Sequence, residues 1–444
     1  MTATDATRDS TSTAQTKREV QQNTSQPESS ATKPRNFLRN LGPGLITGAA
    51  DDDPSGIATY SQAGAAFGYG LLWTAIISFP LMIAVQFMCA RIGIVTQTGL
   101  GSVLRKHYSP WLLWFACILL LIGNTINIAA DLSGMAAAGT LLTGVGAIWL
   151  VPCFTVLILT LLIYASYETM TRIFKWMTLA LFSYVFAALL AHPSWWSVLM
   201  GTIRPHVTFS REYLLTIVAI LGTTISPYLF FWQASQNAEQ SEHEAPSGRH
   251  RRAVQLELKS AQQDVNMGMF VSNIIMYFII LTAGATLHKA GITNVQTAQQ
   301  AATALRPLAG PLASWLFAFG LVGTGMLGVP VLAGSAAYAV AEAAAWKNGM
   351  DETVHTASHF YGVIGFAMLV GTGLALVHVN AIKLLFWSAV ANGLLAPPLI
   401  VIILFVCNNT TVMRSYKNGR LSNLLGIAAA ALMSAAAIGL IISW

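Results

Sequence analysis

Charged side chains are scarce in this sequence. Only 9% of its 444 residues are Asp, Glu, Lys or Arg, whereas 55% are hydrophobic. Soluble globular domains carry about 25% charged residues, so the composition excludes that class and indicates a polytopic membrane protein. The formal net charge is +6. Because the basic residues are scattered over short segments and form no patch, we expect a lipid bilayer and no nucleic acid as the partner.

Cysteine is also rare. The four cysteines lie in apolar segments without CxxC or His-flanked spacing: Cys89, Cys117, Cys153 and Cys407. This excludes a disulfide framework and a thiolate metal site, and we expect all four to be packing residues. The sequence also lacks a nucleophile–base constellation, a phosphate loop and an HExxH motif. We therefore expect neither an enzyme nor a bound cofactor.

Large apolar side chains are almost absent from the beginning of the chain, which is rich in Ser, Thr and Gln. This composition predicts a disordered cytoplasmic tail over residues 1–36. A signal peptide would need an apolar central region, which this stretch lacks. The rest of the chain, residues 37–444, is predicted to form one transmembrane domain.

Apolar runs dominate that domain. With about 20 residues needed to cross a bilayer, they predict an all-α membrane protein with about eleven transmembrane helices, at 41–67, 71–95, 111–135, 146–165, 172–192, 213–238, 266–287, 309–345, 358–379, 382–407 and 424–443. Segment 239–265 is polar, and we expect a cytoplasmic loop with a short amphipathic portion around Val254–Leu258. Lys and Arg alternate between loops so that the N-terminus is predicted to be cytoplasmic and Trp444 outside.

The first of these spans contains an unusual polar interruption, Gly48-Ala-Ala-Asp-Asp-Asp53-Pro54-Ser-Gly56. Proline removes a backbone donor and clashes with the preceding turn, and glycine lowers helix propensity, so we expect the helix to be unwound near Asp53. Irregular backbone at membrane depth is tolerated only where it is buried in protein or lines a cavity. Carboxylates at that depth are usually functional. The interruption therefore predicts a cation site.

A second interruption, Gly222-Thr-Thr-Ile-Ser226-Pro227-Tyr228, opens the sixth span. If residues 41–192 and 213–407 are two repeats of five spans each, the odd number forces them into opposite orientations, with an extra helix over 424–443. Such inverted repeats are typical of secondary transporters, whose substrates bind where broken helices meet. Taken alone, Pro227 could simply kink a packed helix. Breaks at corresponding places in both halves favour a transport site.

The sequence also resembles the NRAMP divalent metal transporters. The stretch "LGPGLITGAADDDPSGIATYSQAGAAFGYGLLW" at 41–73 is similar to the first span of that family, where the signature is Asp-Pro-Gly-Asn. The likeness continues in order to "LAPPLIVIILFVCNNTTVM" at 395–413. It implies an amino-acid/neurotransmitter sodium symporter-like fold with an inverted 5+5 repeat. It also implies a secondary-type carrier that imports divalent cations by alternating access.

The resemblance implies a metal site, with departures from the family pattern. The family aspartate falls on Asp53, but the asparagine falls on Gly56, and the family Met-Pro-His falls on Ser226-Pro227-Tyr228. The implied ligands are Asp53, Gly56, Ser226 and the carbonyl groups of Ala50 and Thr223. A thioether favours soft transition metals, whereas oxygen ligands favour Mg²⁺ and Mn²⁺. The loss of the methionine is similar to the NRAMP-related magnesium transporters, so we expect Mg²⁺ first and Mn²⁺ second.

Proton coupling is expected to be weak or absent. Asp131 matches an acidic position that the family uses for proton movement, but it could instead be a polar side chain bonded across helices. Tyr228 stands in place of the family histidine, and tyrosine, with an unperturbed pKa of about 10, is a poor proton carrier at neutral pH. Asp51 and Asp52 are additional to the pattern. They either line the approach to Asp53 or are solvated at the mouth of a cavity.

Three alternatives stay open at this point. One is a proton-coupled Mn²⁺/Fe²⁺ symporter whose site has drifted. Another is a cation-coupled importer of small organic solutes such as amino acids, although three neighbouring aspartates would repel a substrate carboxylate. The third is a membrane sensor that transports nothing, which the missing family ligands would explain. The sequence gives no indication of a protein partner.

Overall fold

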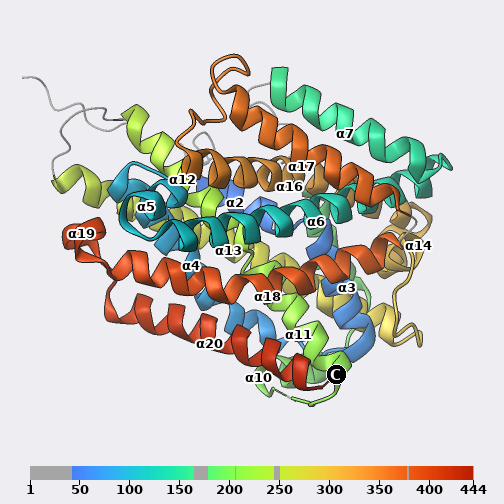
Figure 1. Cartoon of the computed structure of the whole chain (residues 1–444). Coiled ribbons are helices and arrows are strands. Elements are labelled where there is room, and N and C mark those ends of the chain that lie inside the picture. The colour runs from blue at the N-terminus through green and yellow to red at the C-terminus, as the bar shows by residue number, and fades with distance from the viewer. Residues whose placement is uncertain (1–42, 165–178, 206, 245–250, 378–379, 444) are drawn as a thin grey trace, which may run out of the picture. The chain divides into compact units, whose positions relative to one another are not determined.

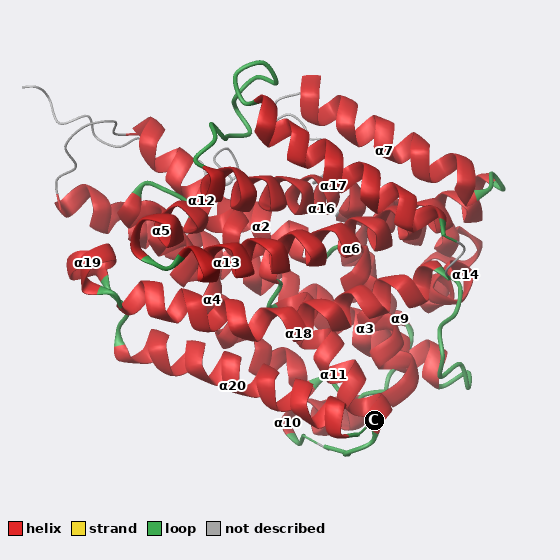
Figure 2. Cartoon of the chain, in the orientation of Figure 1, coloured by secondary structure: helices red, strands yellow, loops and turns green. Residues whose placement is uncertain are grey.

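The structure is a computed structural model that describes residues 43–164, 179–205, 207–244, 251–377 and 380–443. Its regular secondary structure within those ranges consists of helices, without a strand (Figure 2). The predicted all-α class is therefore confirmed. The predicted tail over residues 1–36 lies outside the described residues.

Nine helical segments of the described chain are long and apolar enough to cross a membrane. They consist of α4 (Trp73–Thr96), α6 (Pro110–Thr143), α7 (Ala147–Tyr164), α11 (Arg211–Thr224) with most of α12 (Pro227–Glu244), α13 (Arg251–Ala283) with η2 (Gly284–His288), the segment that ends in α16 (Ala313–Ala344), α17 (Ser358–Leu376), α18 (Ala381–Asn408) and α20 (Arg420–Ile442). Each coincides with one predicted span. The predicted first span is two short helices, and the predicted fifth span is described only from residue 179, so the count agrees with about eleven.

Shorter elements connect or complete these spans. They are α2 (Pro43–Asp51), α3 (Pro54–Phe67), α5 (Leu100–His107), η1 (Leu179–Phe182), α9 (Ser183–Leu190), α10 (Trp195–Ile203), α14 (Ala298–Ala302), η3 (Thr303–Leu305), α15 (Arg306–Ala309), η4 (Gly310–Leu312), α19 (Thr410–Met413) and η5 (Arg414–Tyr416). Because α2 and α3 are each shorter than a bilayer requires, only their combination can span it.

Both predicted helix breaks are present. At the first break, α2 ends at Asp51 and α3 begins at Pro54, and Asp53 between them has an extended backbone with φ −67° and ψ 172°. At the second break, α11 ends at Thr224 and α12 begins at Pro227. Each proline stands at the first position of its helix, where the missing N–H costs nothing.

The broken helices lie among α6, α13, α16 and α18. Helix α6 packs against α16, α17 and α18, with α17 and α7 on one side of it and α18 and α20 on the other in Figure 1. Helices α2 and α3 pack against α13, and α3 and α11 pack against α18. Both breaks are consequently enclosed by protein, as irregular backbone at membrane depth must be.

The predicted loop over 239–265 is wrong for its described part. Helix α12 continues to Glu244, and α13 begins at Arg251, before the apolar stretch starts. The stretch is rich in Glu, Gln, Arg and Ala, which are good helix formers. The two helices therefore extend beyond their apolar segments. Residues 245–250 lie outside the described residues.

The cysteines largely behave as predicted. All four are free, and Cys89, Cys117 and Cys407 are buried packing residues. Cys153 is exposed on α7 instead. A membrane-spanning helix presents one face to lipid rather than to water, so an apolar environment there does not require burial in protein.

Candidate metal-binding site

Asp53 lies at the centre of the first break. Its side-chain Oδ1 accepts hydrogen bonds from the Gly56 N–H at 2.9 Å and from the Ser55 hydroxyl at 2.6 Å, so it caps the N-terminus of α3. Negative side chains are favoured at that end of a helix. The residue is buried. Capping occupies Oδ1 and leaves Oδ2 directed elsewhere, so the cap and a metal ligand can coexist in one carboxylate.

Tyr228, the first residue after Pro227 in α12, joins the two breaks. Its hydroxyl oxygen lies 3.0 Å from the Ala50 carbonyl oxygen and 3.1 Å from Asp53 Oδ2. A phenol has a single proton and can donate it to only one of these acceptors at a time. Two of the predicted ligand atoms therefore converge on one point, where a cation would compete with the phenol proton.

Gly328 of α16 forms a wall of this site. A Cβ atom at Gly328 would lie 3.2 Å from the Asp53 Cβ, 3.8 Å from Asp131 Oδ2 and 4.0 Å from the Ala50 carbonyl oxygen. Asp131, on α6, thus faces the same space as Asp53. It is fully buried, and neither of its carboxylate oxygens has a hydrogen-bond partner among the described residues.

The predicted ligands at the second break contact one another. The Ser226 hydroxyl donates to the Thr223 carbonyl oxygen at 2.7 Å and lies 3.2 Å from the Gly222 carbonyl oxygen. It thereby satisfies carbonyl groups that the end of α11 leaves without a partner. The Ser226 side chain also lies close enough to Asp51 to act on that carboxylate. No hydrogen bond joins Ser226 to Asp53 within the part of the chain that the structure describes.

The electrostatics of the site favour a cation. Helices α2 and α11 end at the breaks and α3 and α12 begin there, so the opposite half-charges of their termini offset one another and the Asp53 carboxylate supplies the negative charge. In the described residues, no three His, Cys, Asp or Glu side chains are grouped so as to hold a metal ion. A bound ion would therefore complete its shell with carbonyl, hydroxyl and water oxygens, which is the chemistry of hard divalent cations.

Asp51 and Asp52 are not solvated. Both side chains are buried, so the alternative that placed them at the mouth of a cavity is wrong. Asp51 Oδ2 and Asp52 Oδ1 lie 2.9 Å and 3.2 Å from the Ser272 hydroxyl of α13. Close packing of α2 on α13 encloses them, since a Cβ at Gly48 would overlap the backbone of Gly268.

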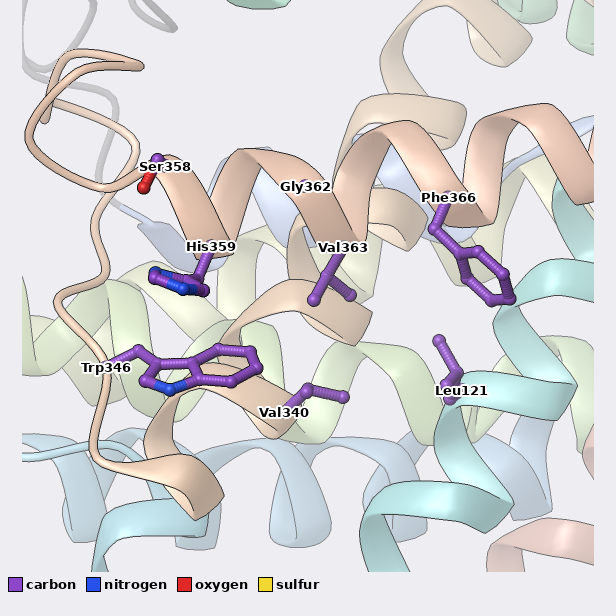
Figure 3. Close-up of a pocket in the computed structure, with 8 residues that line it drawn as sticks. All are labelled: Leu121, Val340, Trp346, Ser358, His359, Gly362, Val363 and Phe366. Carbon is purple, nitrogen blue, oxygen red and sulfur yellow. The ribbon is translucent and has the colours of Figure 1, made fainter.

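Two surface cavities lie apart from these residues. One, of about 370 Å³, lies between α6, α16 and α17, where Trp346 stacks on His359 above an apolar floor (Figure 3). The other, of about 420 Å³, lies beside the end of α6 and the start of α18 and includes Ser133 and Asn380. Neither is lined by a carboxylate. They therefore lack the ligand chemistry of a divalent cation site.

Several residues at the site were not predicted. Gly328, Ser272 and Tyr60 carry no distinctive sequence signal by themselves, because small and aromatic residues are common in membrane helices. One signal was present: Gly44 and Gly48 form a GxxxG pattern, which allows two membrane helices to approach closely. That spacing predicts a tight partner for α2 but does not identify α13. A Cβ at Gly222 would overlap the Ala389 carbonyl oxygen, so α11 and α18 also approach each other closely.

Comparison with known proteins agrees with this architecture. The family model Nramp, described as "Natural resistance-associated macrophage protein-like", matches residues 44–443. The divalent metal cation transporter MntH of Bradyrhizobium diazoefficiens is 31% identical over 301 residues, which cover 66% of this chain and 65% of that protein. The match thus spans slightly less than two thirds of the relative's length.

Two solved structures share the fold. The crystal structure of an Eremococcus coleocola manganese transporter, in complex with an aromatic bis-isothiourea substituted compound, has a TM-score of 0.73 and 19% identity and covers 91% of this chain and 87% of its own. Mhp1, a nucleobase-cation-symport-1 family transporter, has a TM-score of 0.55 and 14% identity over 91% of this chain and 94% of its own. At these identities the similarity concerns the fold alone. It agrees with the predicted symporter-like architecture.

Proposed function

Because the chain belongs to the Nramp family, whose members are transporters and not enzymes, we propose that it carries divalent metal cations across a membrane. The relative MntH is described as a divalent metal cation transporter. We further propose import by alternating access, with Mg²⁺ preferred and Mn²⁺ second. The cation is the substrate, and no cofactor takes part. In the proposed orientation the N-terminus is cytoplasmic and Trp444 lies outside.

The proposed preference for Mg²⁺ rests on one observation. The Tyr228 hydroxyl, the Ala50 carbonyl and Asp53 Oδ2 bring together oxygen atoms only, and Ser226 stands where the family has a thioether. Hard cations prefer such ligands. Mg²⁺ dehydrates reluctantly and usually retains several waters, so a site with one carboxylate and small neighbours suits a partly hydrated ion. The proposed ligands are Asp53 and the Ala50 and Thr223 carbonyls, with Ser226 and Gly56 beside them.

Uptake into proteoliposomes tests this proposal. Mg²⁺, Mn²⁺, Fe²⁺ and Ca²⁺ are supplied one at a time and then in pairwise competition. We expect the fastest uptake for Mg²⁺, inhibition of that uptake by Mn²⁺, and little transport of Fe²⁺. Strong preference for Fe²⁺ over Mg²⁺ would reject the magnesium assignment. Absence of flux from folded, metal-binding protein would instead support the sensor alternative.

We propose that transport is coupled weakly or not at all to protons. Two charges that move inward through 100 mV gain about 4.6 kcal/mol, which corresponds to a roughly 2,000-fold concentration ratio. The membrane potential alone is therefore a sufficient driving force. Tyr228 occupies the place of the family histidine. Asp131 and the aspartates at the first break are ionisable groups near the proposed ion that could move a proton.

The rival is a proton-coupled Mn²⁺/Fe²⁺ symporter. It is distinguished by divalent influx driven by a potassium diffusion potential, with a trapped dye reporting the pH of the vesicle lumen. We expect influx without acidification. Acidification that depends on the metal and disappears in Asp131→Asn would establish coupling and reject our proposal. Import of an amino acid in place of a metal would appear in the same vesicles as uptake of a labelled amino acid unaffected by divalent cations.

A further inference from the structure

Beside Asp53, the first break contains a second group of buried oxygen atoms. Asp51 and Asp52 direct one carboxylate oxygen each toward the Ser272 hydroxyl, at 2.9 Å and 3.2 Å. That hydroxyl has one proton for two acceptors. The other oxygens, Asp51 Oδ1 and Asp52 Oδ2, have no hydrogen-bond partner among the described residues, although both side chains are buried.

Tyr60 of α3 supplies an independent observation. Its hydroxyl is fully buried and has no hydrogen-bond partner within the described ranges. Asp51, Asp52 and the Thr223 side chain are among its neighbours. A Cβ at Gly56 would touch both the Tyr60 ring, at 3.2 Å, and the Asp51 carbonyl oxygen, at 3.6 Å. Three buried polar side chains with unused hydrogen-bonding capacity therefore face the same small region.

No basic side chain neutralises these carboxylates. Within the described chain, neither Asp51 nor Asp52 forms a salt bridge with a Lys, Arg or His side chain. An uncompensated carboxylate charge in an apolar interior is strongly unfavourable, so a buried carboxylate either takes up a proton, is paired with a cation or coordinates a metal ion. Two carboxylates and a hydroxyl that converge within hydrogen-bonding distance are the ligand types that Mg²⁺ and Mn²⁺ prefer.

The geometry is fixed by the packing of α2 on α13. Gly44 and Gly48 lie one helical turn apart and approach the α13 backbone at Val265 and Gly268. Ser272, one turn beyond Gly268, meets the end of α2 at Asp51 and Asp52. Because backbone meets backbone along this seam, the ends of α2 and α13 that carry these side chains are held close together. The oxygen atoms of Asp51, Asp52 and Ser272 therefore lie close together before an ion binds.

We propose that Asp51, Asp52 and Ser272, with the Tyr60 hydroxyl beside them, form a second binding site for a hard divalent cation. It lies on the α2 side of the break, whereas Asp53 turns toward α3 and Tyr228. This inference rests on the proposed transport function and extends it, because the second site would hold an ion next to the transport site and pass it across the break when α2 moves. The ion class is the same at both sites, since both offer oxygen ligands only.

Binding stoichiometry tests the second site without transport. The purified full chain is titrated with Mn²⁺ in nanodiscs, and bound ions are counted by electron paramagnetic resonance. We expect two ions per chain in the wild type, and a spectrum broadened by interaction between the two ions. We expect one ion in Asp51→Asn combined with Asp52→Asn, and one in Asp53→Asn. Excess Mg²⁺ should displace both.

Ser272→Ala is the milder variant and should weaken the second ion at least fivefold while the first is unchanged. Ser388→Ala, at a buried serine of α18 whose hydroxyl donates within its own helix, is the matched control and should still bind two ions. One ion in the wild type, or two in the double variant, would overturn the second site. The broadened wild-type spectrum decides the question even where a variant fails to fold.

The test also separates the two proposals. If wild-type protein binds a single ion, loses it in Asp53→Asn and still transports Mg²⁺ or Mn²⁺, the second site is wrong and the transport proposal stands. If two ions bind but no divalent cation enters vesicles, the transport proposal fails and the second site remains.

Discussion

Each break leaves backbone groups of a helix end without a hydrogen-bond partner, and the two breaks satisfy these groups with opposite chemistry. At the first break, Asp53 accepts hydrogen bonds from the free N–H of Gly56 and from Ser55, so an acidic side chain satisfies the start of α3. At the second break, Ser226 donates to the free carbonyl groups of Gly222 and Thr223, so a hydroxyl satisfies the end of α11. The first break thus keeps a negative charge for a cation, whereas the hydroxyls of Thr223, Thr224 and Ser226 at the second break donate to backbone carbonyl groups of α11.

Because of this difference, we expect the two breaks to have different roles in cation binding. Asp53 retains Oδ2 for an ion, with Tyr228 as its present partner. The Thr223 carbonyl accepts a hydrogen bond from Ser226, and its second lone pair stays available to an ion. We therefore expect substitutions at the first break to affect binding strength and those at the second to affect selectivity.

The largest effect is expected from Asp53. Asp53→Ala and Asp53→Asn should each lower Mn²⁺ uptake in proteoliposomes by about 100-fold or more, since a buried cation loses its charged partner at a cost of about 3 kcal/mol. Ser226→Ala, the matched change at the other break, should lower uptake by less than about fivefold. Near-normal uptake by Asp53→Asn at normal expression would mean that the cation binds elsewhere.

The next effect concerns the packing that holds the first break. Gly48→Ala would place a methyl group into the backbone of Gly268, and we expect a loss of stability of about 1–3 kcal/mol from overpacking. The control is Gly365→Ala on α17, where a Cβ would have no atom within 4 Å. Thermal unfolding in mild detergent measures both. Equal midpoints for the two variants would contradict the close approach of α2 to α13.

A smaller change at the site wall should affect affinity alone. Gly328→Ala adds a methyl group 3.2 Å from the Asp53 Cβ and 3.8 Å from Asp131 Oδ2. We expect cation affinity to fall about tenfold, or about 1.4 kcal/mol, with little loss of fold. Mn²⁺ binding by calorimetry is the readout, with Gly362→Ala, a glycine with open space around it, as the control. Unchanged affinity would place the ion away from α16.

Tyr228 tests whether a hydroxyl competes with the ion. Tyr228→Phe removes the group that contacts the Ala50 carbonyl and Asp53 Oδ2. If the cation must displace that hydrogen bond, which is worth about 1 kcal/mol, affinity should rise about fivefold. Weaker binding would show instead that the phenol oxygen is itself a ligand. The same titration of wild type and variant distinguishes these results.

The smallest expected change is a shift in the preference among divalent metal ions. Ser226→Met introduces a thioether at the second break and should shift transport toward Mn²⁺, Fe²⁺ or Cd²⁺ relative to Mg²⁺, because sulfur favours softer metals. Pairwise competition in proteoliposomes measures the ratio, with Ser226→Leu as a control of similar size without sulfur. The same selectivity series in both variants would mean that this side chain does not face the ion.

Local sequence was sufficient to predict the membrane helices and both helix breaks. The positions of the membrane helices follow from apolar runs, and both breaks follow from Pro54 and Pro227, because these are properties of neighbouring residues. Asp53 followed from its place beside the first proline. The helical character of 239–265 was missed, since polar composition was taken to indicate a loop although its residues favour helices.

Contacts between distant segments were decided only by the tertiary structure. The Tyr228 hydroxyl reaches Ala50 and Asp53, and the Ser272 hydroxyl reaches Asp51 and Asp52, across 175 or more residues in each case. Such meetings depend on where small residues let helix backbones approach, and a GxxxG pattern shows that a helix packs closely without showing against which partner. The sequence therefore determined the residues next to the two breaks, Asp53 and Ser226 among them, and helix packing determined which distant residues, such as Ser272, meet them.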